Sequence, residues 1–591
     1  MTTTSRHSLP SFTWPLLAGV VLLYAWYVLA VQNADLLWQV QNFTSLLPDS
    51  PHTYAGHPGA WREWAGDWLT QCCYYPWLGA ALLVMLWAVG ALALVRACRL
   101  QQGWQLAALV PVAALLASIT QLGYWLFCLK APSYWFGPSI GFACVALWMW
   151  LLSRLSSWAV PMALWVWLKV GFPLLGWYAT LGLATAIIML LTICRPPRDG
   201  RRRCTWLSLV AIALSATTLC LYYHHAPSVH WREPLPLYGL HHLANPECQS
   251  TLLEVAFWVM AASVLLMPLV GWLQTWRHGA RLHWLGLPLL ITALCLANMM
   301  HYRNANFHAE LRMLRQLEEG RWDDLLLEMK QLQQRPTREM VLMKDVALAQ
   351  QGQLGQRAFC YDYRGVRPQM NVALPIHINH SAGPLIYYWL GLPNYAFMWC
   401  MEDNIEYGLS PYFLKLMYRA SMAAGQTATA RKYYLLLTRH HLFYRHYAEV
   451  SPSELQQVRR FMTGHDALTN DRGYCEIYLM QRLPHERYAD AACQQLAVHE
   501  AMLMRDREAF ASALSHYAAL TPGQPLPRHF VEAQMYFGMA EPDAALSQYR
   551  ARLQQLQEAG VARLDIGRQL YPAFGQTYWW YYDFCLDHKS Y

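Results

Sequence analysis

The sequence predicts an all-α protein with two parts, a polytopic transmembrane helix bundle of about nine spans over residues 1–302 and a tetratricopeptide-like α-helical solenoid over residues 303–591. Three observations predict this fold. Only 14% of the residues are charged, whereas about a quarter is usual in soluble domains. Apolar runs that are long enough to cross a bilayer recur as far as residue 300. After Tyr302 the sequence becomes charged and amphipathic.

The apolar runs define the predicted spans. A helix needs about 20 apolar residues to cross the hydrocarbon core of a bilayer, with a range of roughly 17 to 25. Seven runs fit this length: 12–30, 74–95, 104–129, 136–153, 204–222, 252–274 and 283–300. The run 156–194 is too long for one span. Because Lys169, Gly171 and Pro173 lie near its middle, we expect a tight turn there between two short helices.

Basic residues in the loops predict the orientation, because Lys and Arg accumulate on the cytoplasmic side of a membrane. If the N-terminus is cytoplasmic, most basic loop residues lie on the cytoplasmic side. They are Arg6, Arg96, Arg99, Arg154, the cluster 195–203 (RPPRDGRRR), Arg277 and Arg281. An odd number of crossings then places the residues after Tyr302 outside the cytoplasm. We therefore expect a multi-pass protein of a bacterial inner membrane with a periplasmic C-terminal part. No nucleic-acid partner is expected, since no aromatic stacking platform accompanies the cluster.

Helical repeats are predicted after the last span. The segment FHAELRMLRQLEEGRWDDLLLEMKQLQQRPT indicates two helices that turn at Gly320 and end before Pro336, and Gly352 marks a similar turn further along. A helix–turn–helix repeat of about 34 residues is typical of tetratricopeptide arrays, whose stacked units form a concave surface for peptides or proteins. The spacing is irregular after the second unit, so an irregular helical domain is the alternative.

The first external loop, residues 31–72, is the longest connection between the predicted spans. Trp61, Trp64 and Trp68 have the spacing i, i+3 and i+7, which places them on one face of a helix. Such a helix is expected to lie at the membrane surface, with the tryptophans as interfacial anchors in contact with lipid. Asp35 follows the first span directly. The simplest interpretation is a solvated acid at the polar end of an anchor.

The position of Asp35 also resembles that of the catalytic acid in type C membrane glycosyltransferases, some of which carry tetratricopeptide repeats. The resemblance implies a sugar donor on a polyprenyl phosphate, Asp35 as the catalytic residue, and Lys130, Lys169 and Arg232 as candidate ligands of the lipid phosphate. A divalent metal would be needed only by such an enzyme, and otherwise no cofactor is predicted. The loop after Leu129 (KAPSYWFGPS) lacks the second-loop acid of many members.

Two stretches resemble an uncharacterised family of Bacteroidota membrane proteins that joins a polytopic half to a helical-repeat half. They are HPGAWREWAGDWLTQCCYYPWLGA and GRWDDLL…VALAQQGQLGQRAFCY. This resemblance implies the architecture of most of the chain and no activity.

Residues 222–248 contain several potential metal ligands, but interfacial histidines are the expected interpretation and no metal site is predicted: His224, His225, His230, His241, His242 and Cys248. Walker, HExxH and GxGxxG motifs are absent from the sequence. Three functions therefore stay open. The first is an anchored external domain that binds a protein, peptide or glycan, and the second is a type C glycosyltransferase. The third is a transporter or flippase, for which Lys169 and Glu254 are the nearest intramembrane ionisable residues.

Overall fold

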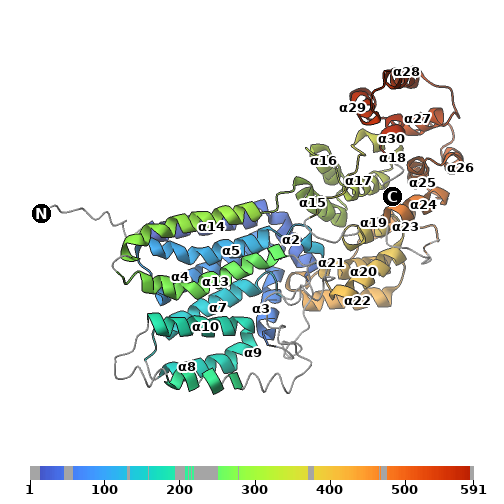
Figure 1. Cartoon of the computed structure of the whole chain (residues 1–591). Coiled ribbons are helices and arrows are strands. Elements are labelled where there is room, and N and C mark those ends of the chain that lie inside the picture. The colour runs from blue at the N-terminus through green and yellow to red at the C-terminus, as the bar shows by residue number, and fades with distance from the viewer. Residues whose placement is uncertain are drawn as a thin grey trace.

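The computed structural model describes residues 13–44, 58–128, 133–156, 159–193, 206–210, 212–214, 216–217, 251–276, 279–370, 378–464, 466 and 475–585. The elements within these ranges are helices, accompanied by one isolated β-bridge between Thr337 and Val366. The predicted all-α class is therefore confirmed. Helices from the first 302 residues lie together in one body, and the helices from α15 onward extend from one end of it (Figure 1).

Five helical segments are long and apolar enough to cross a membrane, and each coincides with a predicted span. They are Trp14–Gln32, Pro76–Ala97, Gly103–Thr120, Glu254–Leu273 and Leu282–Met300. Their elements are α1 (Thr13–Tyr27) with η1 (Val28–Gln32), α4 (Pro76–Ala97), η4 (Gln102–Leu109) with α5 (Val110–Thr120), α13 (Thr251–Leu273), and η7 (Gly279–Leu285) with α14 (Gly286–Met300). Large apolar side chains such as Leu23, Leu266 and Met299 are exposed on them.

Three shorter apolar helices complete the bundle: α7 (Gly137–Leu152), the continuous segment α8 (Ala159–Val166), η5 (Trp167–Gly171) and α9 (Phe172–Leu175), and α10 (Trp177–Thr192). Most of the predicted span 204–222 lies outside the described residues.

The hairpin predicted within residues 156–194 is present, but its predicted turn at Lys169–Pro173 is wrong. The helix continues through this stretch, and the chain reverses at Gly176, whose φ of 60° favours glycine. Pro173 lies at the start of α9, directly after the π-helical residues Trp167–Gly171. The indole N–H of Trp167 then donates to the carbonyl of Ala179 across the hairpin at 2.9 Å.

The first external loop folds into α2 (Ala34–Phe43), α3 (Ala60–Thr70) and η3 (Gln71–Tyr74). The surface helix predicted from the tryptophans corresponds to α3, whereas the packing of α2 was not predicted. Residues Leu36 to Phe43 are all buried, because α2 packs between the bundle and helices α15 and α21. Only α3 has an exposed face, and it packs its other face against α7 and α9.

The second body consists of short amphipathic helices, most of which pack against the next helix in sequence. They are α15 (Ala305–Glu319), α16 (Trp322–Gln331), α17 (Arg338–Gln350), α18 (Leu354–Arg357), α19 (Gly383–Trp389), α20 (Pro393–Tyr407), α21 (Pro411–Ala423), α22 (Thr427–His440), α23 (Pro452–Arg460), α24 (Cys475–Arg482), α25 (Ala491–Met504), α26 (Arg507–Leu520), α27 (Arg528–Tyr536), α28 (Ala544–Glu558), α29 (Arg563–Phe574) and α30 (Tyr578–Phe584). The predicted turn at Gly320 separates α15 from α16. Side chains such as Asp490, Asp506 and Asp543 accept hydrogen bonds from backbone N–H groups at the helix starts.

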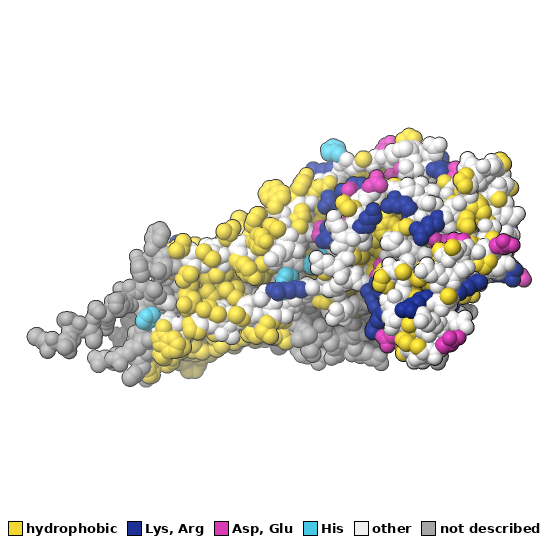
Figure 2. Space-filling view, turned by 90° about the horizontal axis from the view of Figure 1, so that it is seen from above, with side chains coloured by type: hydrophobic (Ala, Val, Ile, Leu, Met, Phe, Trp, Pro, Cys, Tyr) yellow, Lys and Arg dark blue, Asp and Glu magenta, His cyan; other side chains and the backbone are white. Residues whose placement is uncertain are grey.

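The two bodies differ in surface chemistry. Figure 2 shows hydrophobic side chains over the helix bundle and charged side chains gathered over the second body, the C-terminal half of the chain. An apolar outer surface of this extent on several helices is typical of a bundle that lipid covers.

Candidate functional site

Asp35 lies in the first turn of α2, where it meets the second body. Its Oδ2 accepts a hydrogen bond from Nη1 of Arg312 on α15 at 3.2 Å. Nε and Nη2 of Arg312 also donate to the two carboxylate oxygens of Glu328 on α16, both at 3.0 Å. The Asp35 side chain is 29% exposed, and it lines neither of the two cavities described below. Asp35 thus forms an ion pair between the two halves, and its catalytic role stays a prediction.

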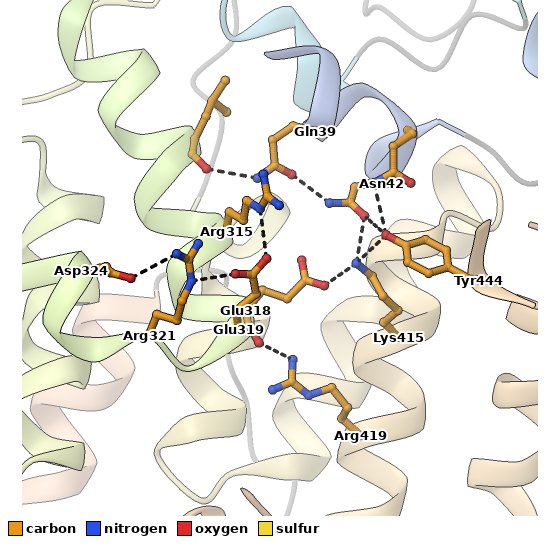
Figure 3. Close-up of polar contacts among 12 residues, drawn as sticks. Gln39, Asn42, Arg315, Glu318, Glu319, Arg321, Asp324, Lys415, Arg419 and Tyr444 are labelled. Atoms are coloured by element: carbon orange, nitrogen blue, oxygen red, sulfur yellow. Dashed lines mark hydrogen bonds and ion pairs between the residues drawn. The ribbon is translucent and has the colours of Figure 1, made fainter. Parts of the chain in front are cut away.

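The polar side chains of α2 form a buried network with the second half (Figure 3). Gln39 Nε2 donates to the carbonyl of Leu311 at 3.2 Å, and its Oε1 accepts from Asn42 Nδ2 at 3.2 Å. Asn42 Oδ1 in turn accepts from Nζ of Lys415 on α21 at 2.9 Å. Because a buried amide without partners is costly, these bonds explain why polar residues occur on a helix that has no free face.

Lys415 is the centre of this network. Its side chain is only 3% exposed, and its ammonium group pairs with the carboxylate of Glu318 on α15. It also donates to the hydroxyl of Tyr444 at 3.3 Å, and that hydroxyl donates to Asn42 at 3.2 Å. One ammonium group therefore holds together α2, α15, α21 and the chain after α22.

Arg419, one turn further along α21, contacts α15, as Figure 3 shows, and also contacts α23. Its Nη1 donates to the carbonyl of Glu318 at 2.9 Å, and its Nε donates to Glu454 at 2.7 Å. Glu454 also accepts from the hydroxyl of Tyr388 at 2.7 Å. The junction is therefore a buried charged region in which Lys415 pairs with Glu318 and Arg419 pairs with Glu454.

His441 lies beside Lys415 and has no hydrogen-bond partner for either ring nitrogen among the described residues. Burial, together with the charge of Lys415, lowers the pKa of His441 to about 3. The ring is therefore neutral at physiological pH and packs against Tyr444, with 4.3 Å between the ring centroids.

A second contact between the halves involves Glu310 of α15. The hydroxyl of Tyr124, which follows α5, donates to Glu310 at 2.5 Å, and Thr337 donates to the other oxygen. Burial raises the pKa of Glu310, and the charge of nearby Glu339 raises it further. The carboxyl group of Glu310 is thus protonated more readily than a solvent-exposed glutamate.

The inner face of α3 carries another polar cluster. Arg62 Nη2 pairs with Glu63 at 2.8 Å, and the guanidinium lies over the ring of Tyr178 with its central carbon 5.2 Å from the ring centroid. Asp67 accepts from the backbone N–H of Ser133 at 2.7 Å. Burial raises the pKa of Asp67 to about 8, so that its carboxyl group is mostly protonated at neutral pH.

The other candidates from the sequence lie apart from these clusters. Trp61 and Trp68 are exposed on the outer face of α3, and Trp64 contacts Trp61 edge to face at 6.1 Å. Lys169 is exposed within η5. Lys130 and Arg232 lie outside the described residues, as do the histidines of 222–248. The anchoring and phosphate-binding roles stay predictions. No cluster of three or more His, Cys, Asp or Glu side chains with metal-binding geometry occurs among the residues that the structure covers.

The cavities among the described residues include the following two. One, of about 820 Å³, lies among α27, α28, α29 and α30 and is lined by Arg528, Val531, Glu532, Met535, Asp543, Ala545, Gln548, Arg552, Gln569, Leu570, Ala573, Phe574, Thr577 and Trp579. The other, of about 930 Å³, lies at the ends of α4, α10 and α13 and is lined by Cys98, Arg99, Gln101, Thr192, Ile193, Gly271, Trp272, Gln274, Thr275 and Trp276.

A family model of unknown function, DUF6057, matches residues 9–585 and thus covers both halves. The chain belongs to the DUF6057 family. The predicted membership of an uncharacterised family is thereby confirmed. Comparison with curated proteins finds no match, and comparison with solved structures finds none either.

Sequence reasoning missed the two polar clusters of this DUF6057 chain. In α2 the signal was the segment WQVQN, whose uncharged amides Gln39, Gln41 and Asn42 alternate with apolar residues. In α3 the signal was the arrangement of Arg62, Glu63 and Asp67 on the face opposite the tryptophans. Both patterns are typical of helices whose polar face packs against protein.

Proposed function

We propose that this protein is a bacterial inner-membrane protein that presents a tetratricopeptide-like helical-repeat domain in the periplasm, where the domain binds a peptide segment of a protein partner. The main support is the groove of about 820 Å³ among α27, α28, α29 and α30. These helices lie at the end of the molecule farthest from the apolar bundle (Figure 1).

Membrane insertion is supported by aromatic residues at both ends of the candidate spans. Trp26 and Trp77 meet at the end next to the helical-repeat half, where the Trp26 indole N–H donates to the Trp77 carbonyl at 3.3 Å. Trp272 and Trp276 pair at the other end, with ring centroids 5.0 Å apart. Tryptophan concentrates at the two membrane–water interfaces. The two groups therefore match the borders of a bilayer.

The orientation follows from the basic residues. Arg96 is in the last turn of α4 and Arg99 follows it, whereas α4 begins beside the helical-repeat half. Arg154 follows the end of α7. Arginines in short loops between spans mark the cytoplasmic side, which favours a periplasmic position of the repeats. We expect an alkaline phosphatase fused to the C-terminus to be active, and activity of only a cytoplasmic reporter there would contradict this orientation.

The tetratricopeptide-like description rests on consecutive antiparallel pairs. Helices α15 and α16, α21 and α22, α25 and α26, and α28 and α29 each pack against one another and are joined by short turns. Such pairs cannot bury their apolar stripes alone, so they stack and leave a concave surface.

The groove has the composition expected of a peptide site. Apolar side chains, including Val531, Met535 and Leu570, can receive side chains of a ligand, and Gln548 and Gln569 can bond its backbone. Its volume falls in the range of roughly 300–1,000 Å³ of ligand sites. A short extended segment with apolar anchors therefore fits it in size and chemistry.

Photo-crosslinking in membranes of the native organism tests this function. A photoreactive residue in place of Ala545, which lines the groove, is expected to capture a discrete protein. Val531→Arg is expected to reduce this product about tenfold or more, which corresponds to about 1.4 kcal/mol of binding free energy.

The matched control is Leu564→Arg, because Leu564 is exposed on α29 and does not line the groove. This variant is expected to leave the product unchanged. Absence of any discrete product, or an equal loss in both variants, would contradict peptide binding in the groove.

A further inference from the structure

The end of α22 and the following turn carry an unusual concentration of positive charge. Between Thr427 and Tyr447 the sequence contains Arg431, Lys432, Arg439 and Arg445 and no acidic residue. Three histidines, His440, His441 and His446, lie in the same segment. The face built from residues 439–446 is called the basic turn below.

The basic turn is fixed to the start of the second candidate span. Gln71 in η3 accepts a hydrogen bond from the backbone N–H of Leu442 at 2.8 Å and donates to the carbonyl of His440 at 3.3 Å. Phe443 stacks on Tyr74, with centroids 5.3 Å apart and planes 7° from parallel, and meets Tyr75 edge to face at 5.4 Å. The span α4 begins at the next residue, Pro76.

This attachment sets the depth of the turn relative to a bilayer. Tyr75 and Trp77 are exposed at the start of α4, where aromatic side chains meet lipid headgroups. Since Phe443 packs on Tyr74 and Tyr75, its neighbours Arg439 and Arg445 lie near the same level. Both arginines are exposed, and within the described part of the chain no ion pair involves them.

We infer that the basic turn binds the anionic headgroups of the phospholipids that surround the bundle. This inference rests on the proposed insertion in a membrane and concerns a surface other than the groove. Arginine forms bidentate hydrogen bonds with phosphate. The contact would give the helical-repeat half a second attachment to the membrane, beside the spans themselves.

Distance from the surface distinguishes the cations of this segment. A basic residue gains about fivefold in affinity when it lies next to an anionic surface, and the gain decays over a Debye length of about 8 Å at physiological salt. Arg431 precedes Arg439 by two turns of α22, or roughly 12 Å at 1.5 Å per residue. Arg431 and Lys432 are therefore matched controls on the same helix.

The test uses the full chain in nanodiscs of phosphatidylcholine alone or mixed with phosphatidylglycerol. Amide hydrogen exchange is measured over residues 439–447. Phosphatidylglycerol is expected to slow this exchange about fivefold for each arginine engaged, and high salt is expected to remove the effect. The variant Arg439→Gln/Arg445→Gln is expected to exchange equally fast in both lipids, whereas Arg431→Gln/Lys432→Gln is expected to behave like the wild type.

Exchange that does not respond to phosphatidylglycerol, or an equal loss of response in the control variant, would overturn the inference. The two proposals fail in different ways. A chain that purifies without detergent and does not enter nanodiscs contradicts membrane insertion, whereas a chain that enters nanodiscs but shows no response contradicts only the basic turn.

Discussion

Helices α2 and α3 belong to the same connection between two candidate spans, yet they use their polar residues differently. In α2 the amides of Gln39 and Asn42 reach across to the helical-repeat half and bond Leu311 and Lys415. In α3 the polar face turns into the bundle, where Asp67 bonds Ser133, and the tryptophans face outward. The first arrangement joins two bodies, and the second fixes a helix on one body.

This difference shows that the position of a polar side chain near a membrane depends on the partner it finds. A hydrogen-bonded amide or a paired charge can be buried at little net cost, whereas an unpaired one cannot. Helix α3 can therefore be polar on its inner face and apolar on its outer face, as is expected if the outer face meets lipid. Helix α2 can be buried on all sides, because protein surrounds it.

The largest expected effect comes from removing Lys415. Lys415→Met leaves Glu318 buried without its counter-ion, and breaking a buried pair in this way costs about 3–5 kcal/mol. Amide exchange over α2 is expected to accelerate accordingly, while exchange over α3 stays unchanged, because α3 does not contact this network.

The double variant Lys415→Met/Glu318→Met is the control, because removing both charges of a buried pair is often close to neutral. Exchange over α2 is expected to return most of the way to the wild-type rate. Equal acceleration in α2 and α3 would show that the single variant destabilises the whole protein and not the junction.

The packing of α3 gives the next largest effect. A Cβ atom on Gly66 would lie 1.8 Å from Oγ of Ser133, so Gly66→Ala forces α3 away from the chain before α7. Overpacking of this kind costs about 1–3 kcal/mol. The midpoint temperature of thermal unfolding in detergent is expected to decrease. In the control Gly19→Ala, the added Cβ meets no atom within 4 Å, and no loss of stability is expected.

The sequence predicted the features that depend on local pattern. The spans at α4, α13 and α14 follow from apolar length, and α15 and α16 follow from their leucine spacing and Gly320. These features need no information about distant residues.

The features that the sequence did not predict depend on contacts between distant parts of the chain. Asn42 and Lys415 are 373 residues apart, and Glu310 and Tyr124 are 186 apart. The burial of α2 could not be predicted from composition, because it depends on packing against α15 and α21. The turn in 156–194 was misplaced because a π-helical turn accommodates Lys169 and Gly171 within the helix.

The protonation of Asp67 distinguishes the two clusters further. Burial raises the pKa of Asp67 from 3.8 to about 8. Between these values the folded protein holds a proton that the unfolded chain has lost, so stability decreases as pH rises through this window. Asp67→Asn keeps the acceptor for Ser133, so its effect at low pH is expected to stay within about 1 kcal/mol.

The measurement compares thermal unfolding of the wild type and Asp67→Asn at about pH 5 and about pH 8. The variant is expected to lose less stability on raising the pH. The difference between the two proteins isolates Asp67, since Glu310, whose pKa burial also raises, contributes equally to both. Parallel losses in the two proteins would contradict a protonated Asp67.

The smallest effect is expected at Asp35. Its ion pair with Arg312 joins the same two bodies as Lys415, but both side chains are partly exposed. A pair of this kind contributes about 0.2–1 kcal/mol, so Asp35→Asn is expected to change amide exchange over α2 far less than Lys415→Met.

A comparison of Asp35→Asn with Arg312→Gln tests whether Asp35 has a role besides the ion pair. If Asp35 only joins the two halves, Arg312→Gln is expected to reproduce every effect of Asp35→Asn, including any change in glycans on exported proteins. If Asp35→Asn abolishes glycosylation of exported proteins while Arg312→Gln does not, and both variants are present at normal levels, the glycosyltransferase hypothesis is supported. Asp35 would then have a role that its neighbours in α2 do not share.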